Sequence, residues 1–64
     1  MIEQYECRYD SNGILFYEVI GNKYNCYAKA IFETNDYKIF VNQQPISARS
    51  AIFIIEVLSS EKRD

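Results

Sequence analysis

Three tight-turn signals divide the chain into short segments, and this division most constrains the fold. Asp10–Gly13 reads Asp-Ser-Asn-Gly, and similar signals stand at Gly21–Lys23 and Thr34–Asp36. Asp and Asn side chains bond to nearby backbone and Gly accepts positive φ, so such clusters favour turns. A polar connector, Asn42–Pro45, ends at the only proline. Alternation favours strands between these signals, with a helix through Ala28, Lys29 and Ala30 as the alternative for residues 26–33.

Residues between the turns alternate in the pattern of β-strands. β-branched and aromatic residues dominate these runs, and side chains with period two fall on opposite faces of a sheet. The sequence therefore predicts four strands, which cover residues 4–9, 14–20, 24–33 and 37–41.

The last segment is predicted to be a helix. Ser47 is suited to cap its first turn, and Ile46 precedes the cap as a staple residue. Lys62 and Arg63 suit the negative end of the helix dipole. Apolar residues recur at helical spacing along a predicted core stripe, which consists of Ala48, Ala51, Ile52, Ile55 and Leu58, with Ile54 beside it. The alternative is a buried fifth strand within 51–58, because the run from Ile52 to Ile55 has high strand propensity.

Hairpin registers predict which side chains share a face. The turns place Tyr9 opposite Ile14, Ile14 opposite Ala30, and Ala30 opposite Val41. All three registers agree on one core face, which would carry Tyr5, Cys7, Tyr9, Ile14, Phe16, Ile20, Tyr24, Cys26, Ala28, Ala30, Phe32, Ile39 and Val41. Residues 1–64 thus form a single α+β domain, a four-stranded antiparallel β-meander with one C-terminal α-helix packed on one face.

One helix covers only one face of a sheet, so the opposite side, here called the outer face, is predicted to be bare. Its apolar residues would be Leu15, Tyr17, Val19, Tyr27, Ile31 and Phe40, flanked by Arg8, Lys29, Lys38, Glu6 and Glu33. On the helix, Phe53 and Val57 would project away from the core as a second apolar patch.

Residues for catalysis and for cofactor or metal binding are scarce. The chain has no His, the commonest general base near neutral pH and the commonest nitrogen ligand for zinc. Cys7 and Cys26 would lie on non-adjacent strands, beyond disulfide reach, as small core residues. Glu18 interrupts the core face, where tyrosine hydroxyls would donate hydrogen bonds to it. The expectation is therefore a non-enzymatic chain without metal or cofactor.

The charge and hydropathy of the chain bear on its partners and location. A net charge of −2 lacks the broad basic footprint of a duplex-binding protein. No apolar run approaches the length of a membrane span, and residues 1–4 lack the pattern of a signal peptide. The sequence predicts a cytoplasmic protein without membrane contact.

A binding function is the interpretation that remains. Tyr, Phe and Arg are enriched at the centres of protein interfaces, and the outer face offers all three. A motif-free domain of 64 residues is typical of small phage or mobile-element inhibitors, such as anti-CRISPR proteins. The first hypothesis is thus a protein-binding inhibitor or regulator, with a protein partner or as a homodimer. The alternative is binding of single-stranded nucleic acid, whose bases stack on aromatic rings.

Overall fold

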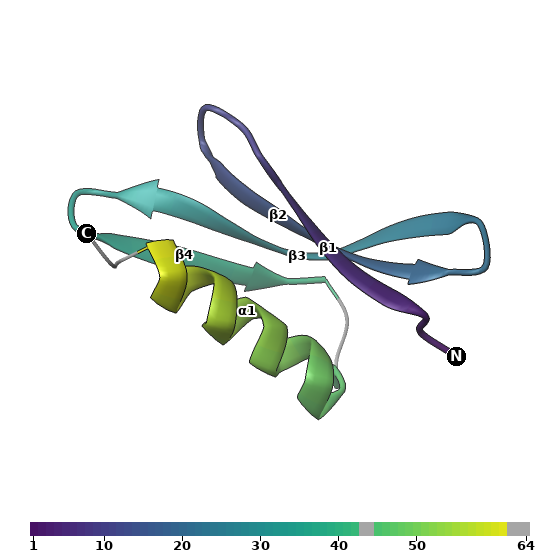
Figure 1. Cartoon of the computed structure of the whole chain (residues 1–64). Helices are drawn as coiled ribbons and strands as arrows, with labels where there is room; N and C mark the ends of the chain where they lie inside the picture. Colours follow the sequence, from purple (N-terminus) through teal and green to yellow (C-terminus); the bar gives the residue numbers. More distant parts are fainter. Residues whose placement is uncertain (43–44, 62–64) are drawn as a thin grey trace.

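The computed structural model describes residues 1–42 and 45–61. Four antiparallel strands lie in the order β1-β2-β3-β4, and a helix follows them (Figure 1). The elements are β1 (Gln4–Tyr9), β2 (Gly13–Ile20), β3 (Lys23–Glu33), β4 (Asp36–Val41) and α1 (Ala48–Glu61). The predicted α+β meander is confirmed, and residues 51–58 are helix rather than a fifth strand.

The first turn forms as its sequence predicts. The Asp10 carboxylate accepts the N–H groups of Asn12 at 2.7 Å and Gly13 at 2.9 Å. The predicted β1–β2 register is confirmed, from Tyr9 opposite Ile14 to Tyr5 opposite Glu18.

A β-bulge changes the second hairpin. Ile14 pairs with Ala30 and Phe16 with Ala28, as predicted, but the register shifts between Phe16 and Tyr17. The extra residue is Tyr27, because Tyr17 pairs with Cys26. An extra residue reverses the alternation of every side chain beyond it. The turn residues are Gly21 and Asn22 alone, and Ile20 pairs with Lys23.

The bulge overturns several predicted face assignments. Tyr27 was predicted to be exposed on the outer face, but its side chain is completely buried, at 0% exposure. Tyr24 and Cys26 were predicted on the core face. They lie instead on the outer face, because Tyr24 pairs with Val19 and Cys26 pairs with Tyr17. Ile20, also predicted on the core face, is exposed at its end of the sheet.

The third hairpin differs from the prediction without changing any face. Ala28 pairs with Val41 and Ala30 with Ile39, a shift of two residues. Because side chains alternate with period two, a two-residue shift leaves each residue on its predicted side.

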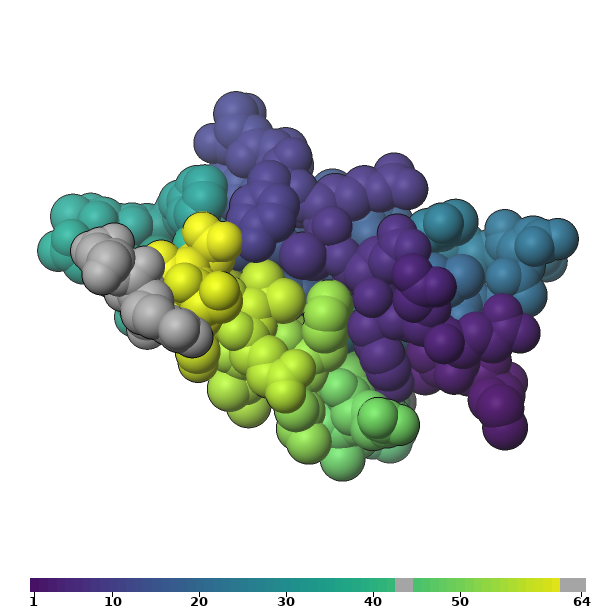
Figure 2. Space-filling view, viewed as in Figure 1, coloured from purple at the N-terminus to yellow at the C-terminus, as the bar shows by residue number. Residues whose placement is uncertain are grey.

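The core lies between the sheet and α1, which packs across one face (Figures 1 and 2). Its buried residues are Ile14, Phe16, Tyr27, Ala28, Ala30 and Ile54. Ser47 caps the helix as predicted, because its hydroxyl accepts the Ser50 N–H at 3.1 Å. Ile46 packs against the core cluster. Lys62 and Arg63 lie outside the described residues.

The helix is rotated relative to its predicted core stripe. Ser50 and Ile54 are buried, and Phe53, Val57 and Leu58 pack against the core. The predicted second patch of Phe53 and Val57 is therefore wrong. Ile52 and Ile55 are instead 51% and 61% exposed, and Ala48 is also exposed.

Buried hydrogen bonds explain this rotation. The Ser50 hydroxyl donates to the Glu18 carboxylate at 2.7 Å, and the Tyr27 hydroxyl donates to the Ser50 carbonyl at 2.8 Å. Buried polar groups cost free energy unless they are bonded, so the helix turns Ser50 rather than an isoleucine toward Glu18.

Candidate binding face

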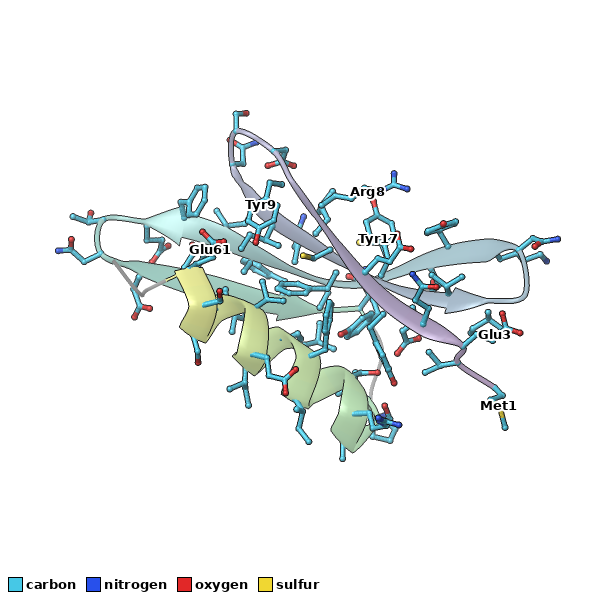
Figure 3. The ribbon with its side chains drawn as sticks, in the orientation of Figure 1. Met1, Glu3, Arg8, Tyr9, Tyr17 and Glu61 are labelled. Carbon is cyan, nitrogen blue, oxygen red and sulfur yellow. The ribbon has the colours of Figure 1, made fainter. Side chains whose placement is uncertain are left out.

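An arginine stacked on two tyrosines forms the centre of the outer face. The Arg8 guanidinium carbon lies 5.0 Å from the ring centre of Tyr17 and 5.3 Å from that of Tyr24. The two rings meet edge to face, with centres 6.3 Å apart. Figure 3 shows Arg8 and Tyr17 on the side of the sheet away from α1. This cluster depends on the bulge, because the bulge turns Tyr24 outward.

A second cation–π cluster lies toward the β4 edge. The ammonium groups of Lys29 and Lys38 lie 5.8 Å and 5.5 Å from the Phe40 ring centre. Lys29 is paired with Phe40 across the β3–β4 ladder, and Lys38 is paired with Ile31. Cations over ring faces hold both partners in place on an exposed surface.

The three cations share this face with the carboxylates of Glu6, Glu33 and Asp36, which the strand ladders place on the same side. Among residues 1–42 and 45–61, Arg8, Lys29 and Lys38 form cation–π contacts but no ion pair. Glu6 shares the face, since it pairs with Tyr17, and it accepts a 2.7 Å hydrogen bond from Gln4. A negatively charged ligand group therefore finds unpaired cations here.

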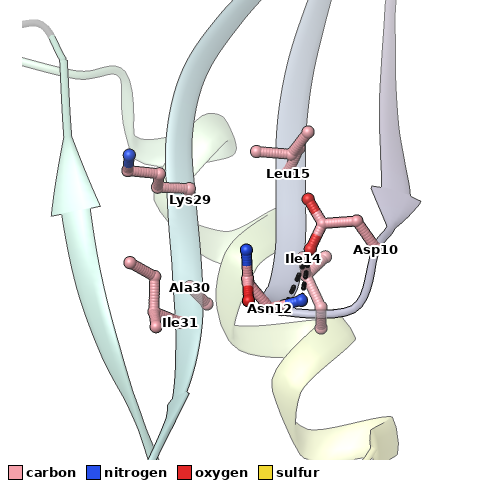
Figure 4. A pocket seen from close by; sticks show the side chains of 8 residues that line it. Asp10, Asn12, Ile14, Leu15, Lys29, Ala30 and Ile31 are labelled. Atoms are coloured by element: carbon pink, nitrogen blue, oxygen red, sulfur yellow. Dashed lines mark hydrogen bonds between the residues drawn. The ribbon is translucent and has the colours of Figure 1, made fainter.

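A small hollow adjoins the two clusters at the β1–β2 turn (Figure 4). It measures about 140 Å³ and is lined by Asp10, Asn12, Gly13, Ile14, Leu15, Lys29, Ala30 and Ile31. Apolar walls with an ammonium and a carboxylate at the rim are typical of a site for one anchoring side chain.

The structure keeps most predicted outer-face residues together. Arg8, Leu15, Tyr17, Lys29, Ile31, Lys38 and Phe40 occupy this side and are exposed or partly exposed. Val19 lies on the same side but is only 8% exposed, so its predicted exposure is wrong. Tyr27 is replaced by Tyr24, which is 51% exposed. The signal for Tyr24 was the pair Gly21-Asn22, which suffices for a two-residue turn.

Glu18 is the polar residue that the sequence predicts on the core face. It is buried, accepts a hydrogen bond from Ser50, and lies near Tyr27 and Tyr5. Burial, and then the negative charge of Glu18, raise the pKa of the Tyr27 phenol well above its usual range, so Tyr27 stays protonated. This protonated hydroxyl is the donor that holds the Ser50 carbonyl.

The remaining candidate chemistry is sparse in the part of the chain that the structure describes. There, no three His, Cys, Asp or Glu side chains gather as metal ligands would. Cys7 and Cys26 are both free thiols. The described helix has neither the length nor the apolar character to cross a bilayer.

Comparisons of the chain with protein-family models, with curated proteins and with solved structures find no match.

Proposed function

We propose that this chain is a non-enzymatic protein-binding module, a small inhibitor or regulator that engages its partner through the outer face. The observation that supports this proposal is Arg8 held over the rings of Tyr17 and Tyr24. Arg and Tyr are enriched at interface hot spots, and Tyr supplies a large contact area at a low conformational-entropy cost. Here the rings already hold Arg8 before any partner arrives, which lowers the entropic cost of association.

The partner surface is expected to combine apolar area with carboxylates. Arg8, Lys29 and Lys38 carry no ion pair within residues 1–42 and 45–61, so partner carboxylates would complement them. The hollow beside Leu15 would accept one aliphatic side chain. We place this activity in the cytoplasm, where reducing conditions preserve the free thiols of Cys7 and Cys26.

The test is affinity capture from the host with a matched control. The double variant Tyr17→Ser, Tyr24→Ser removes both rings beneath Arg8, and it should lose the captured partner while it unfolds at a similar urea concentration. The control variant Ile55→Ser changes an exposed helix residue on the opposite side and should retain the partner. Equal capture by the double variant and the wild-type chain would contradict the proposal.

The second candidate is single-stranded nucleic acid on the same face. The observation that favours it is the alternation of rings and unpaired cations along the strip from Arg8 to Lys38. Phosphate contacts release counterions, so such binding would weaken steeply as salt is raised. Titration of labelled oligonucleotides at low and moderate salt separates the two candidates, and absence of binding at low salt eliminates the second.

A further inference from the structure

Strand β1 is an edge of the sheet, and within residues 1–42 and 45–61 no strand pairs with its outer side. The Asp10 N–H bonds to the Gly13 carbonyl, and the register continues residue by residue along the hairpin. Hydrogen-bonding direction alternates along an antiparallel strand, so even-numbered residues of β1 face β2. The backbone groups of Tyr5, Cys7 and Tyr9 therefore point away from the sheet, where they are available to another strand.

The sequence of β1 is complementary to itself. In an antiparallel pair centred on Cys7, the outward-facing backbone groups of both strands meet, and Glu6 lies opposite Arg8 of the second copy. These opposite charges form a non-hydrogen-bonded pair, in which side chains approach most closely. The opposite edge is less available, since the Asp36 carboxylate already accepts the Tyr37 N–H at 2.8 Å.

The helix carries a matching pattern beside the same edge. A hollow of about 220 Å³ lies between β1 and α1, lined by Tyr5, Arg49, Ile52, Phe53 and Glu56. Arg49 and Glu56 are equally far along the chain from the midpoint between Ile52 and Phe53. Two antiparallel helices centred there place Arg49 of each copy opposite Glu56 of the other.

Cys7, the centre of the strand pattern, and the midpoint between Ile52 and Phe53, the centre of the helix pattern, lie at the same level along the β1 edge. The Phe53 ring lies 5.6 Å from that of Tyr5 and 6.0 Å from that of Phe16, between ring centres. Phe16 is the ladder partner of Cys7, so the helix midpoint lies beside the strand midpoint. A single two-fold axis therefore relates both layers, as an isologous dimer interface requires.

We propose that the β1 edge and the adjoining hollow bind a second copy of this chain, so that two sheets join into one of eight strands. Ile52, half-exposed in the monomer, is buried near the axis. Such association supplies the burial that a 64-residue core lacks. Arg8 belongs to both surfaces, because it stacks on Tyr17 and Tyr24 and would also lie opposite Glu6 of the second copy. The centre of the dimer interface, at Cys7 and Ile52, lies outside that cluster, and the dimer does not rest on the proposed function.

Sedimentation equilibrium on the intact chain tests the dimer, with two exposed isoleucines of α1, Ile52 and Ile55, as a matched pair. The wild-type chain should sediment at twice its monomer mass of 7.6 kDa at micromolar concentration. Ile52→Arg should weaken association at least about tenfold, because it places a charge at the interface centre. Ile55→Arg, three residues further along α1 and outside the lining of the hollow, should remain dimeric. A wild-type chain that stays monomeric up to millimolar concentration overturns the proposal.

Charge exchange on the helix tests the relative placement of the two copies. Arg49→Glu alone and Glu56→Arg alone each create like-charge contacts across the axis and should weaken the dimer. The double variant restores opposite charges and should recover wild-type association. Double-variant association no tighter than that of either single variant overturns the antiparallel arrangement, whatever the outcome of partner capture.

Discussion

Gly13 shows how a single missing side chain permits the sheet to close. A Cβ atom at this position would collide with the backbone carbonyl of Ala30 on the neighbouring strand. At Gly21, by contrast, a Cβ atom would meet nothing within 4 Å, and only the positive φ of 60° favours glycine there. The two glycines therefore serve different needs, close approach at one turn and backbone conformation at the other.

Gly13→Ala should destabilise the fold by about 1–3 kcal/mol, as overpacking against backbone does. Gly21→Asn should cost less, because Asn tolerates the left-handed conformation better than other residues with side chains. Urea unfolding of both variants measures the difference. Equal losses of unfolding free energy in the two variants would show that the sheet relieves the contact between a Cβ atom at position 13 and the Ala30 carbonyl without extra cost.

Ser50 is the residue that fixes the orientation of the helix. Its hydroxyl reaches Glu18 at 2.7 Å and Tyr5 at 3.3 Å, and its carbonyl accepts the Tyr27 hydroxyl. These bonds join three strands and the helix at one buried point. A buried carboxylate gains free energy from a hydrogen-bond donor, and an isoleucine such as Ile52 or Ile55 in the place of Ser50 would offer none to Glu18.

Ser50→Ala should lower the free energy of unfolding by about 1–3 kcal/mol, because Glu18 loses a buried hydrogen-bond donor. Ser59→Ala, at an exposed position of the same helix, should stay within about 0.5 kcal/mol of the wild-type chain. Thermal or urea unfolding compares the two. A Ser50→Ala variant as stable as Ser59→Ala would show that Ser50 does not fix the orientation of the helix.

At the scale of elements, α1 follows polar contacts where hydrophobic periodicity alone favours another face. Ala48, Ile52 and Ile55 are spaced as a core stripe should be, yet all three are exposed. Phe53 packs instead, with its ring edge to face against Phe16 at 6.0 Å. Periodicity ranks faces by apolar content, and it cannot weigh the burial of Glu18 on another element.

Phe53→Ala should therefore destabilise the fold by about 3 kcal/mol, as the loss of a packed aromatic side chain does. Ile55→Lys should change stability by no more than about 0.5 kcal/mol. Unfolding curves of the two variants, measured side by side, give the answer. A larger loss of stability in Ile55→Lys than in Phe53→Ala would contradict the observed helix orientation and support the face that periodicity predicts.

The strands show what local sequence does and does not determine. Turn residues and alternation suffice for four strands, their order and the β1–β2 register, because these depend on neighbours in the chain. The bulge at Tyr27 was not predicted, because the buried hydrogen bond from the Tyr27 hydroxyl to the Ser50 carbonyl joins residues far apart in the chain. Seven of the nine predicted outer-face residues lie on that face and are at least partly exposed, Tyr27 and Val19 are buried, and Tyr24 lies on the face although it was predicted on the core face.

The whole molecule divides into two unlike sides. One side is the core, closed by α1, and at its far end the Tyr9 hydroxyl donates a 2.7 Å hydrogen bond to Glu61 (Figure 3). The other side carries no element of the described chain, and its rings and cations lie open. A dimer through β1 would place two such faces on the same side of one sheet, giving a partner two sites at a fixed separation.

Site-specific photo-crosslinking tests the central proposal, that the outer face binds the partner, most directly. A photoreactive residue at position 24, among the outer rings, should capture one protein other than the chain itself. The same residue at position 55, which is also exposed and lies on the helix, should capture none. Capture of that protein from position 55 but not from position 24 would contradict the account.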